Sequence, residues 1–196
     1  VWREIEQLGS ELGQLGSLAS AGSAARVAIV FEWDSWWSIE QQAVPTTLSY
    51  LNGVLSWYRA FFERNVLVDF VTSTSDLAAY SIVVAPSLFA ASSAGLSNLD
   101  AFAESGGQLV VTYQTAITDD SARITVGGYL GLLQHTLGVR IEEFAPLSGG
   151  EIADIAGVRL PAVRIEGQIN GYGQLWSEYL QAVDCEVVSS FTRGHL

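Results

Sequence analysis

Residues 26–31 read RVAIVF, and this short run decides the fold. Further along, residues 81–85 read SIVVA and residues 108–113 read QLVVTY, and these runs are apolar at successive rather than alternate positions. A strand that is apolar throughout is buried on both faces, as in a parallel sheet between two layers of helices. Together with a fourth run over residues 66–71, they predict a doubly wound, three-layer α/β fold on a mostly parallel sheet.

Helical periodicity fills the gaps between these runs. A helix is predicted over residues 45–63, with Pro45 suited to its start, and a shorter one over residues 96–104. The last third of the chain predicts short strands between Gly-rich turns, and we expect them to extend the sheet as an antiparallel or mixed part. These strands are predicted at 139–144, 152–155, 158–160, 163–166, 175–179 and 186–191.

The first twenty residues form a separate unit. Apolar residues recur there at spacings of three and four, which predicts an amphipathic helix, although Gly9, Gly13 and Gly16 weaken it. Such a helix depends on packing against another element. We expect residues 1–22 to be a helix and linker, and residues 23–196 to be the domain proper.

The charge balance excludes several partners. The 196 residues carry 9 basic groups, all arginine, against 21 acidic ones, a net charge of −12. Because such a field repels phosphate backbones and anionic lipid, neither nucleic acid nor a membrane is expected as a partner. The sequence also lacks a membrane-length apolar run and a signal-peptide pattern, so we expect a cytoplasmic protein.

Cysteine and histidine are scarce. Cys185 is the only cysteine, which excludes an intramolecular disulfide, and the metal-binding spacings HxxxH, HxH and CxxC are absent. We therefore expect no metal and no cofactor. The chain has no methionine and begins at Val1, from which we expect a segment of a larger protein.

The predicted turns lack the groups that common active sites require. Residues 31–34 read FEWD, acidic where a phosphate needs bare backbone amides, and residues 112–115 read TYQT, without a Cys or Ser nucleophile. Glycoside hydrolysis needs two carboxyl groups across a sugar-sized cleft. Glu142 and Glu143 are neighbours on a predicted strand and point to opposite faces, and we interpret Asp119-Asp120 as a solvated acidic turn.

One segment concentrates groups suited to binding. Residues 32–40 read EWDSWWSIE and directly follow the first predicted strand, at the edge where open α/β sheets hold ligands. Trp rings stack on sugars and also anchor protein interfaces, and carboxylates hydrogen-bond sugar hydroxyls. The candidates for an interface or a substrate-cavity wall are Trp33, Asp34, Trp36, Trp37 and Glu40. Aromatic packing within the domain is the alternative.

Residues 26–40, RVAIVFEWDSWWSIE, resemble the start of the trimerisation domain of family 42 β-galactosidases, where a run of the form F-[DE]-W-[DE]-S-W-W-A-x-E is typical. The resemblance continues in the same order over nearly the whole chain, at residues 58–69, 80–86, 106–113 and 127–144. The family often has prolines in the loop after G-G-Y, where this chain has Leu130 and Leu132.

The resemblance implies a fold like that of class I glutamine amidotransferases (flavodoxin-like), without the nucleophile. It further implies that both catalytic glutamates lie on a barrel outside this chain, so the chain alone is no enzyme and its parent is a retaining β-galactosidase. Such parents are homotrimers in which this domain contacts a neighbouring subunit and borders the galactoside cavity. Residues 1–22 would be the tail of the barrel.

Two other functions remain open. The same tryptophans could serve a carbohydrate-binding module that takes galactosides. A self-sufficient amidotransferase-like hydrolase is the third hypothesis. It needs a nucleophile, which residues 112–115 do not supply.

Overall fold

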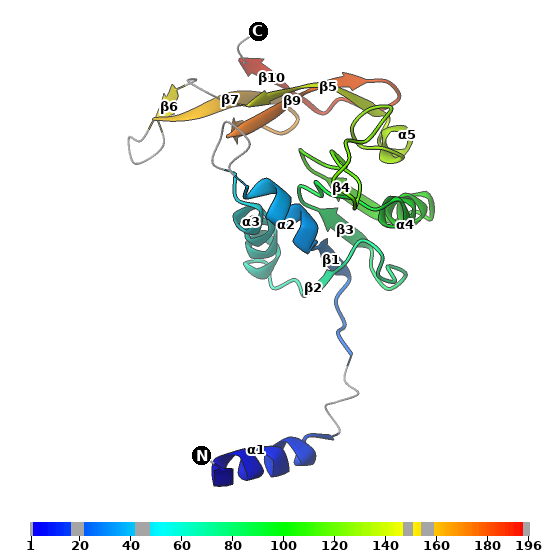
Figure 1. Ribbon diagram of the computed structural model, residues 1–196. Coiled ribbons are helices and arrows are strands. Elements are labelled where there is room, and N and C mark those ends of the chain that lie inside the picture. The colour runs from blue at the N-terminus through cyan, green and yellow to red at the C-terminus, as the bar shows by residue number, and fades with distance from the viewer. Residues whose placement is uncertain (1, 17–21, 42–47, 147–150, 154–158, 194–196) are drawn as a thin grey trace.

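The computed structural model describes residues 2–16, 22–41, 48–146, 151–153 and 159–193. Figure 1 shows three parts in chain order: an isolated helix, a layered α/β part, and a group of antiparallel strands at the opposite end of the molecule from that helix.

The centre of the α/β part is a four-stranded sheet. Its strands are β1 (Val27–Val30), β2 (Val68–Val71), β3 (Ile82–Ala85) and β4 (Gln108–Val111), in the order β2-β1-β3-β4. All three pairings are parallel, with Val27 opposite both Val68 and Ile82. The prediction of a parallel sheet from successive apolar residues is confirmed.

Helices cover both faces of this sheet. Alternate residues of a strand point to opposite sides, so each strand packs against helices on both. Ala28 and Val30 pack in one buried cluster with Leu99 of α4 (Ser93–Glu104). Ile29 packs in a second cluster with Val54 of α3 (Tyr50–Phe62) and with α2 (Trp33–Ile39). The two clusters make this part three-layered.

Side-chain caps fix where the two longer helices begin. The Ser49 hydroxyl accepts a hydrogen bond from the Asn52 N–H at 3.3 Å and starts α3, and Ser92 does the same for α4 through the Gly95 N–H at 3.0 Å. Such caps satisfy N–H groups that have no partner in the first turn. The predicted start at Pro45 lies outside the described residues.

The C-terminal third forms sheets of its own. After the short helix α5 (Leu133–Leu137), β5 (Val139–Pro146) pairs antiparallel with β9 (Trp176–Ala182). A second group joins β7 (Arg159–Gly167) to three antiparallel neighbours, which are β6 (Glu151–Ala153), β8 (Gly171–Gln174) and β10 (Ser189–Arg193).

The expectation that these strands extend the parallel sheet is therefore wrong, and β5 shows the physical reason. Ile141 is buried against the sheet's helical layer, whereas its neighbours Arg140 and Glu142, which point to the other face of β5, are exposed. A strand with one polar face fits a ribbon that is buried on one side only, and not a sheet covered on both faces.

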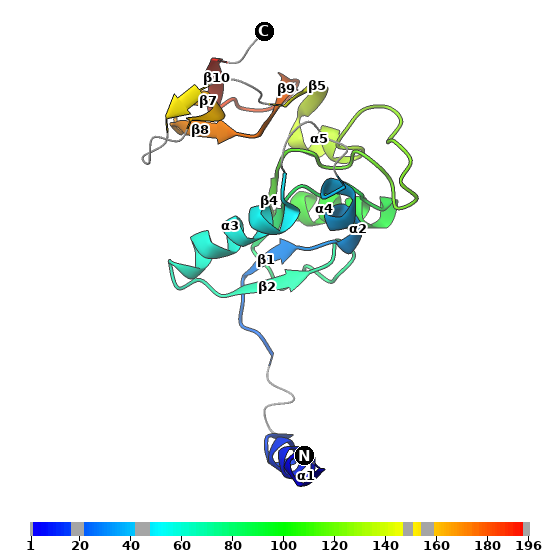
Figure 2. The same ribbon diagram turned by 60° about the vertical axis from the view of Figure 1, so that its left-hand side comes forward.

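The N-terminal helix α1 (Trp2–Gln14) lies apart from the rest in both views (Figures 1 and 2). It is helical as predicted and none of its residues is buried, so its apolar stripe faces solvent: Trp2, Ile5, Leu8 and Leu12.

Candidate functional site

The predicted tryptophan segment forms α2 and the turn that leads into it. Trp33 and Trp36 stack at 5.2 Å between ring centroids, and Trp33 and Trp37 are 6.0 Å apart. Positions i, i+3 and i+4 share one face of a helix, which is why these three rings meet. Trp36 also contacts Phe31 edge-on at 5.8 Å and is half-buried.

Two of the three tryptophans point outward. Trp33 is 57% exposed and Trp37 is 59% exposed, which is unusual for the largest apolar side chain. The three tryptophans thus have different surroundings. Trp36 packs within the domain, while Trp33 and Trp37 present apolar surface to solvent.

The carboxylates of the segment divide in the same way. Glu32 turns inward and accepts hydrogen bonds from the Ser73 N–H at 2.7 Å and the Ser73 hydroxyl at 2.6 Å. Glu40 accepts one from the Ser49 hydroxyl at 3.2 Å. Asp34 is exposed, and no described residue bonds to its carboxylate. Asp34 is therefore the carboxylate best placed to meet an outside group.

Anchors on both sides hold α2 in place. The buried Ser35 hydroxyl donates to the Ala90 carbonyl at 3.2 Å and accepts from the Ala90 N–H at 3.1 Å. The Tyr50 hydroxyl accepts from the Glu32 N–H at 2.9 Å. Burial raises the pKa of Tyr50 to about 12, so this phenol stays neutral at physiological pH. The exposed tryptophans are thus mounted on a fixed element.

A second polar group lies at the carboxyl end of β4. It joins Gln114, in the turn considered in the sequence analysis, to Glu178, which was not predicted to be near it. Gln114 has a left-handed φ of 57°, and its N–H donates to the carboxylate of Glu178 on β9 at 2.7 Å. The Trp176 indole N–H donates to the same carboxylate at 3.4 Å. Burial raises the pKa of Glu178, against the opposing effect of these two bonds.

The side chain at this turn is an amide and not a nucleophile. Gln114 is buried, and its Oε1 has no hydrogen-bond partner among the described residues. A left-handed residue just after a strand is where some hydrolases place a nucleophile. The turn could be found in the sequence. Its contact with Glu178 could not, because Glu178 is 64 residues further along the chain and no local pattern links the two.

The other carboxylates have structural surroundings. Asp119 accepts hydrogen bonds from the Ser121 and Arg123 N–H groups at 2.8 and 2.9 Å, and the bond from Arg123 is the main cause that lowers its pKa. Glu142 and Glu143 are both exposed on β5.

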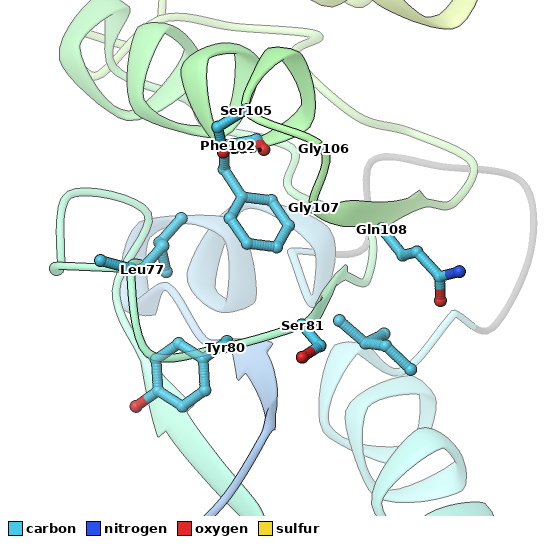
Figure 3. A pocket seen from close by; sticks show the side chains of 10 residues that line it. Leu77, Tyr80, Ser81, Phe102, Ser105, Gly106, Gly107 and Gln108 are labelled. Atoms are coloured by element: carbon cyan, nitrogen blue, oxygen red, sulfur yellow. Dashed lines mark hydrogen bonds between the residues drawn. The ribbon is translucent and has the colours of Figure 1, made fainter.

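A shallow depression of about 470 Å³ lies at the amino ends of β3 and β4, between them and the end of α4 (Figure 3). Two hydroxyl groups that line it are already engaged. Tyr80 donates its hydroxyl to Asp69 at 3.0 Å, and the Ser81 hydroxyl accepts from Arg26 at 2.9 Å. The Phe102 ring lies against Gly107. Packing explains this depression without a ligand.

In the described ranges, no three His, Cys, Asp or Glu side chains gather as a metal ion would require. No described helix is long and apolar enough to cross a membrane.

Known proteins resemble the chain over most of its length. A family model described as the β-galactosidase trimerisation domain matches residues 25–195. The β-galactosidase BgaB of Geobacillus sp. (strain Y412MC61) is 40% identical over 147 residues, which cover 74% of this chain and 22% of that protein. The β-galactosidase LacZ of Heyndrickxia coagulans is 30% identical over 200 residues, which cover 100% of this chain and 28% of that protein.

A solved structure agrees with this likeness. The crystal structure of β-galactosidase from Bacillus circulans sp. alkalophilus matches with a TM-score of 0.80 at 26% identity, covering 99% of this chain and 29% of that one. The chain thus spans about a quarter of the length of the relatives that it matches.

Proposed function

Because the chain belongs to the family of β-galactosidase trimerisation domains, we propose that it is the non-catalytic assembly domain of a retaining family 42 β-galactosidase. In this proposal it helps to hold three copies together and forms part of the wall of the active-site cavity. Its partners are other subunits of the same protein and the catalytic domain of its own chain, and the substrate of the whole enzyme is a β-galactoside.

Exposed aromatic surface is the observation that carries the assembly role. Trp33 and Trp37 are exposed on a helix that Ser35 and Tyr50 hold rigidly in place. Tryptophan is enriched among the residues that dominate binding energy at protein interfaces, and burying such a ring removes a large apolar area from water. We refer to Trp33, Asp34 and Trp37 as the tryptophan patch. Beside it, the Trp36 ring stacks on that of Trp33, and Glu40 accepts a hydrogen bond from Ser49.

The chemistry of the enzyme is assigned to another part of the polypeptide. Retaining glycosidases use two carboxyl groups close together, one of them with a raised pKa. Among the described residues with resolved shifts, Glu178 is the carboxyl whose pKa is raised, and its surroundings are backbone and indole N–H groups. A glutamate in that position fits a structural role.

The fold supports a likeness to class I glutamine amidotransferases without their nucleophile. The strand order β2-β1-β3-β4 agrees with the first four positions of the flavodoxin-like order 2-1-3-4-5. Gln114 takes a left-handed conformation after β4, at a turn that could hold a nucleophile, and offers only an amide. Residues 1–22 are proposed as the tail of the catalytic barrel, since α1 has no buried residue and carries an exposed apolar stripe.

Two measurements on the complete encoded polypeptide test the assembly role. Light scattering gives its mass with and without the double change Trp33→Ala and Trp37→Ala, and a chromogenic galactoside assay is run on the same samples. We expect the wild type to be a trimer and the double variant to lose mass towards the monomer. An unchanged trimer would contradict the assignment of the patch, and galactoside cleavage by residues 1–196 alone would contradict a non-catalytic domain.

A second candidate function is carbohydrate binding by the same patch. Two exposed indole rings beside Asp34, a carboxylate with no described partner, match the stacking and hydrogen-bonding needs of a sugar. Titration of tryptophan fluorescence with galactose or lactose separates this function from assembly. A saturable change in wild type that is absent in Trp37→Ala would favour it, and a flat titration would exclude it.

A further inference from the structure

A second exposed aromatic surface lies at the edge of the parallel sheet. β2 is an edge strand and pairs with β1 on one side only. Beside it, Phe62 is 63% exposed, Leu67 is 64% exposed and Phe70 is 49% exposed. The Tyr58 ring contacts both Phe62 and Phe70 at 5.7 Å, which makes the surface continuous. We call these four residues the edge patch.

The local backbone presents the edge patch outward. α3 ends at Phe62, and Asn65 takes a left-handed φ of 57°, which turns the chain back into β2. The Val66 N–H donates to the Phe61 carbonyl at 3.1 Å and closes this turn. An open strand edge with large apolar side chains promotes association unless something covers it. Figure 2 shows α3 leading into β2 at this edge.

The two patches lie at opposite ends of α3. The amino end of the helix meets the turn before α2, because Tyr50 bonds to Glu32 and its ring lies 5.6 Å from Phe31. The edge patch surrounds its carboxyl end at Phe62. A helix of 13 residues is about 20 Å long, so the patches are separate surfaces.

The patches also differ in charge, because two arginines of the chain lie near the edge patch and acidic residues lie near the tryptophans, although Glu63 and Asp69 are at the edge patch as well. Asp34 and Glu40 accompany the tryptophans, whereas Arg59 and Arg64 flank Phe62, with Glu63 between them. The whole chain has 9 basic residues, so two exposed arginines within six positions are a local concentration. Arg59 lies one helical turn before Phe62, on the same side of α3, and can reach a partner carboxylate next to that ring.

Symmetry links these observations. In a cyclic trimer every interface is heterologous, so a surface on one copy meets a different surface on the next. We propose that the tryptophan patch of one copy docks against the edge patch of a second copy, with Asp34 facing Arg59. The proposal rests on the assembly function above and names the surface that receives the tryptophans.

Charge reversal in the complete polypeptide tests the contact. Asp34→Arg and Arg59→Glu should each weaken trimer association at least about ten-fold, and the two together should restore much of it, because the reversed pair attracts again. Arg140→Glu on β5 makes the same charge change at a remote exposed site and should leave association unchanged. Light scattering over a concentration series measures each variant.

Cross-linking gives an independent result and separates the two proposals. In a Cys185→Ser background, Asp34→Cys and Arg59→Cys together should give covalent trimers with a short bifunctional maleimide, and each change alone should give none. Dimers from Asp34→Cys alone would mean that like surfaces meet and would overturn the inference. A trimer that Trp37→Ala destroys but Arg59→Glu and Phe62→Ala leave intact would overturn it while sparing the assembly role. A monomeric wild type would overturn both.

Discussion

The N–H of Gln114 and the carboxylate of Glu178 form a 2.7 Å hydrogen bond that joins two parts of the molecule. Gln114 follows β4 of the parallel sheet, and Glu178 lies on β9 of the antiparallel ribbon. Trp176, two residues before Glu178, is buried in the cluster that also covers β1. A polar contact and an apolar contact next to each other thus help to fix the ribbon to the sheet.

Replacing Glu178 should change how stability depends on pH. Burial raises its pKa in the folded state, so the folded protein binds this proton more tightly than the unfolded chain does. The resulting stability is fully present below the ordinary pKa of a glutamate and is lost as pH rises through the folded value. As pH rises from about 4, the free energy of unfolding of wild type should therefore fall relative to that of Glu178→Gln.

Urea denaturation at a series of pH values measures this difference. Glu178→Ala is the comparison, because it also lacks the titrating group but removes the acceptor of the Gln114 N–H, so it should be about 1–3 kcal/mol less stable than Glu178→Gln at every pH. Curves for wild type and Glu178→Gln that stay parallel over this range would contradict the prediction.

Tyr50→Phe should destabilise the protein although it removes a single atom. The Tyr50 hydroxyl is the acceptor for the Glu32 N–H at the start of α2, and Tyr50 is buried. A buried N–H without an acceptor costs about 1–3 kcal/mol. Tyr172→Phe, at an exposed position, should be neutral in the same thermal or urea unfolding experiment. Equal effects of the two changes would refute the role of the bond.

Local pattern was enough to predict the parallel sheet, but the short helix α2 was not predicted. Residues 27–30 and 83–85 are buried at successive positions, as expected. Trp33, Trp36 and Trp37 meet because helical spacing brings them together. Which of them faces solvent depends on Phe31 and on neighbours distant in sequence, and local pattern carries no such information.

Contacts between distant segments account for what the sequence did not predict. The pairing of β5 with β9 joins residues such as Val139 and Ala182, and short strands with one polar face fit either a sheet edge or a separate ribbon. Glu178 lies on the strand predicted over residues 175–179. Its role depends on Gln114, which only the folded chain brings near.

Replacing Gly107 and replacing Gly53 by alanine should change the free energy of unfolding in opposite directions. A Cβ at Gly107 would come within 2.3 Å of the Phe102 ring, which is buried and has little room to move. Gly107→Ala should therefore cost about 1–3 kcal/mol of unfolding free energy. Gly53 lies within α3 with nothing within 4 Å of the added atom, so Gly53→Ala should stabilise by about 1 kcal/mol. Thermal unfolding of both variants measures the difference, and the same sign for both would contradict it.

Replacing Trp36 and replacing Trp37 should affect the stability of the domain differently. Trp36 is half-buried against Phe31, so Trp36→Ala removes packing within the domain and should lower the free energy of unfolding by about 2 kcal/mol. Trp37 is 59% exposed, and Trp37→Ala should change it by less than about 1 kcal/mol. Urea unfolding of residues 1–196 provides both values.

The small effect expected at Trp37 matters for assembly. If the Trp37→Ala polypeptide loses the trimer but keeps its unfolding curve, it has lost a contact between subunits and not its fold. A large loss of stability at Trp37 would instead mean that the ring packs within its own domain.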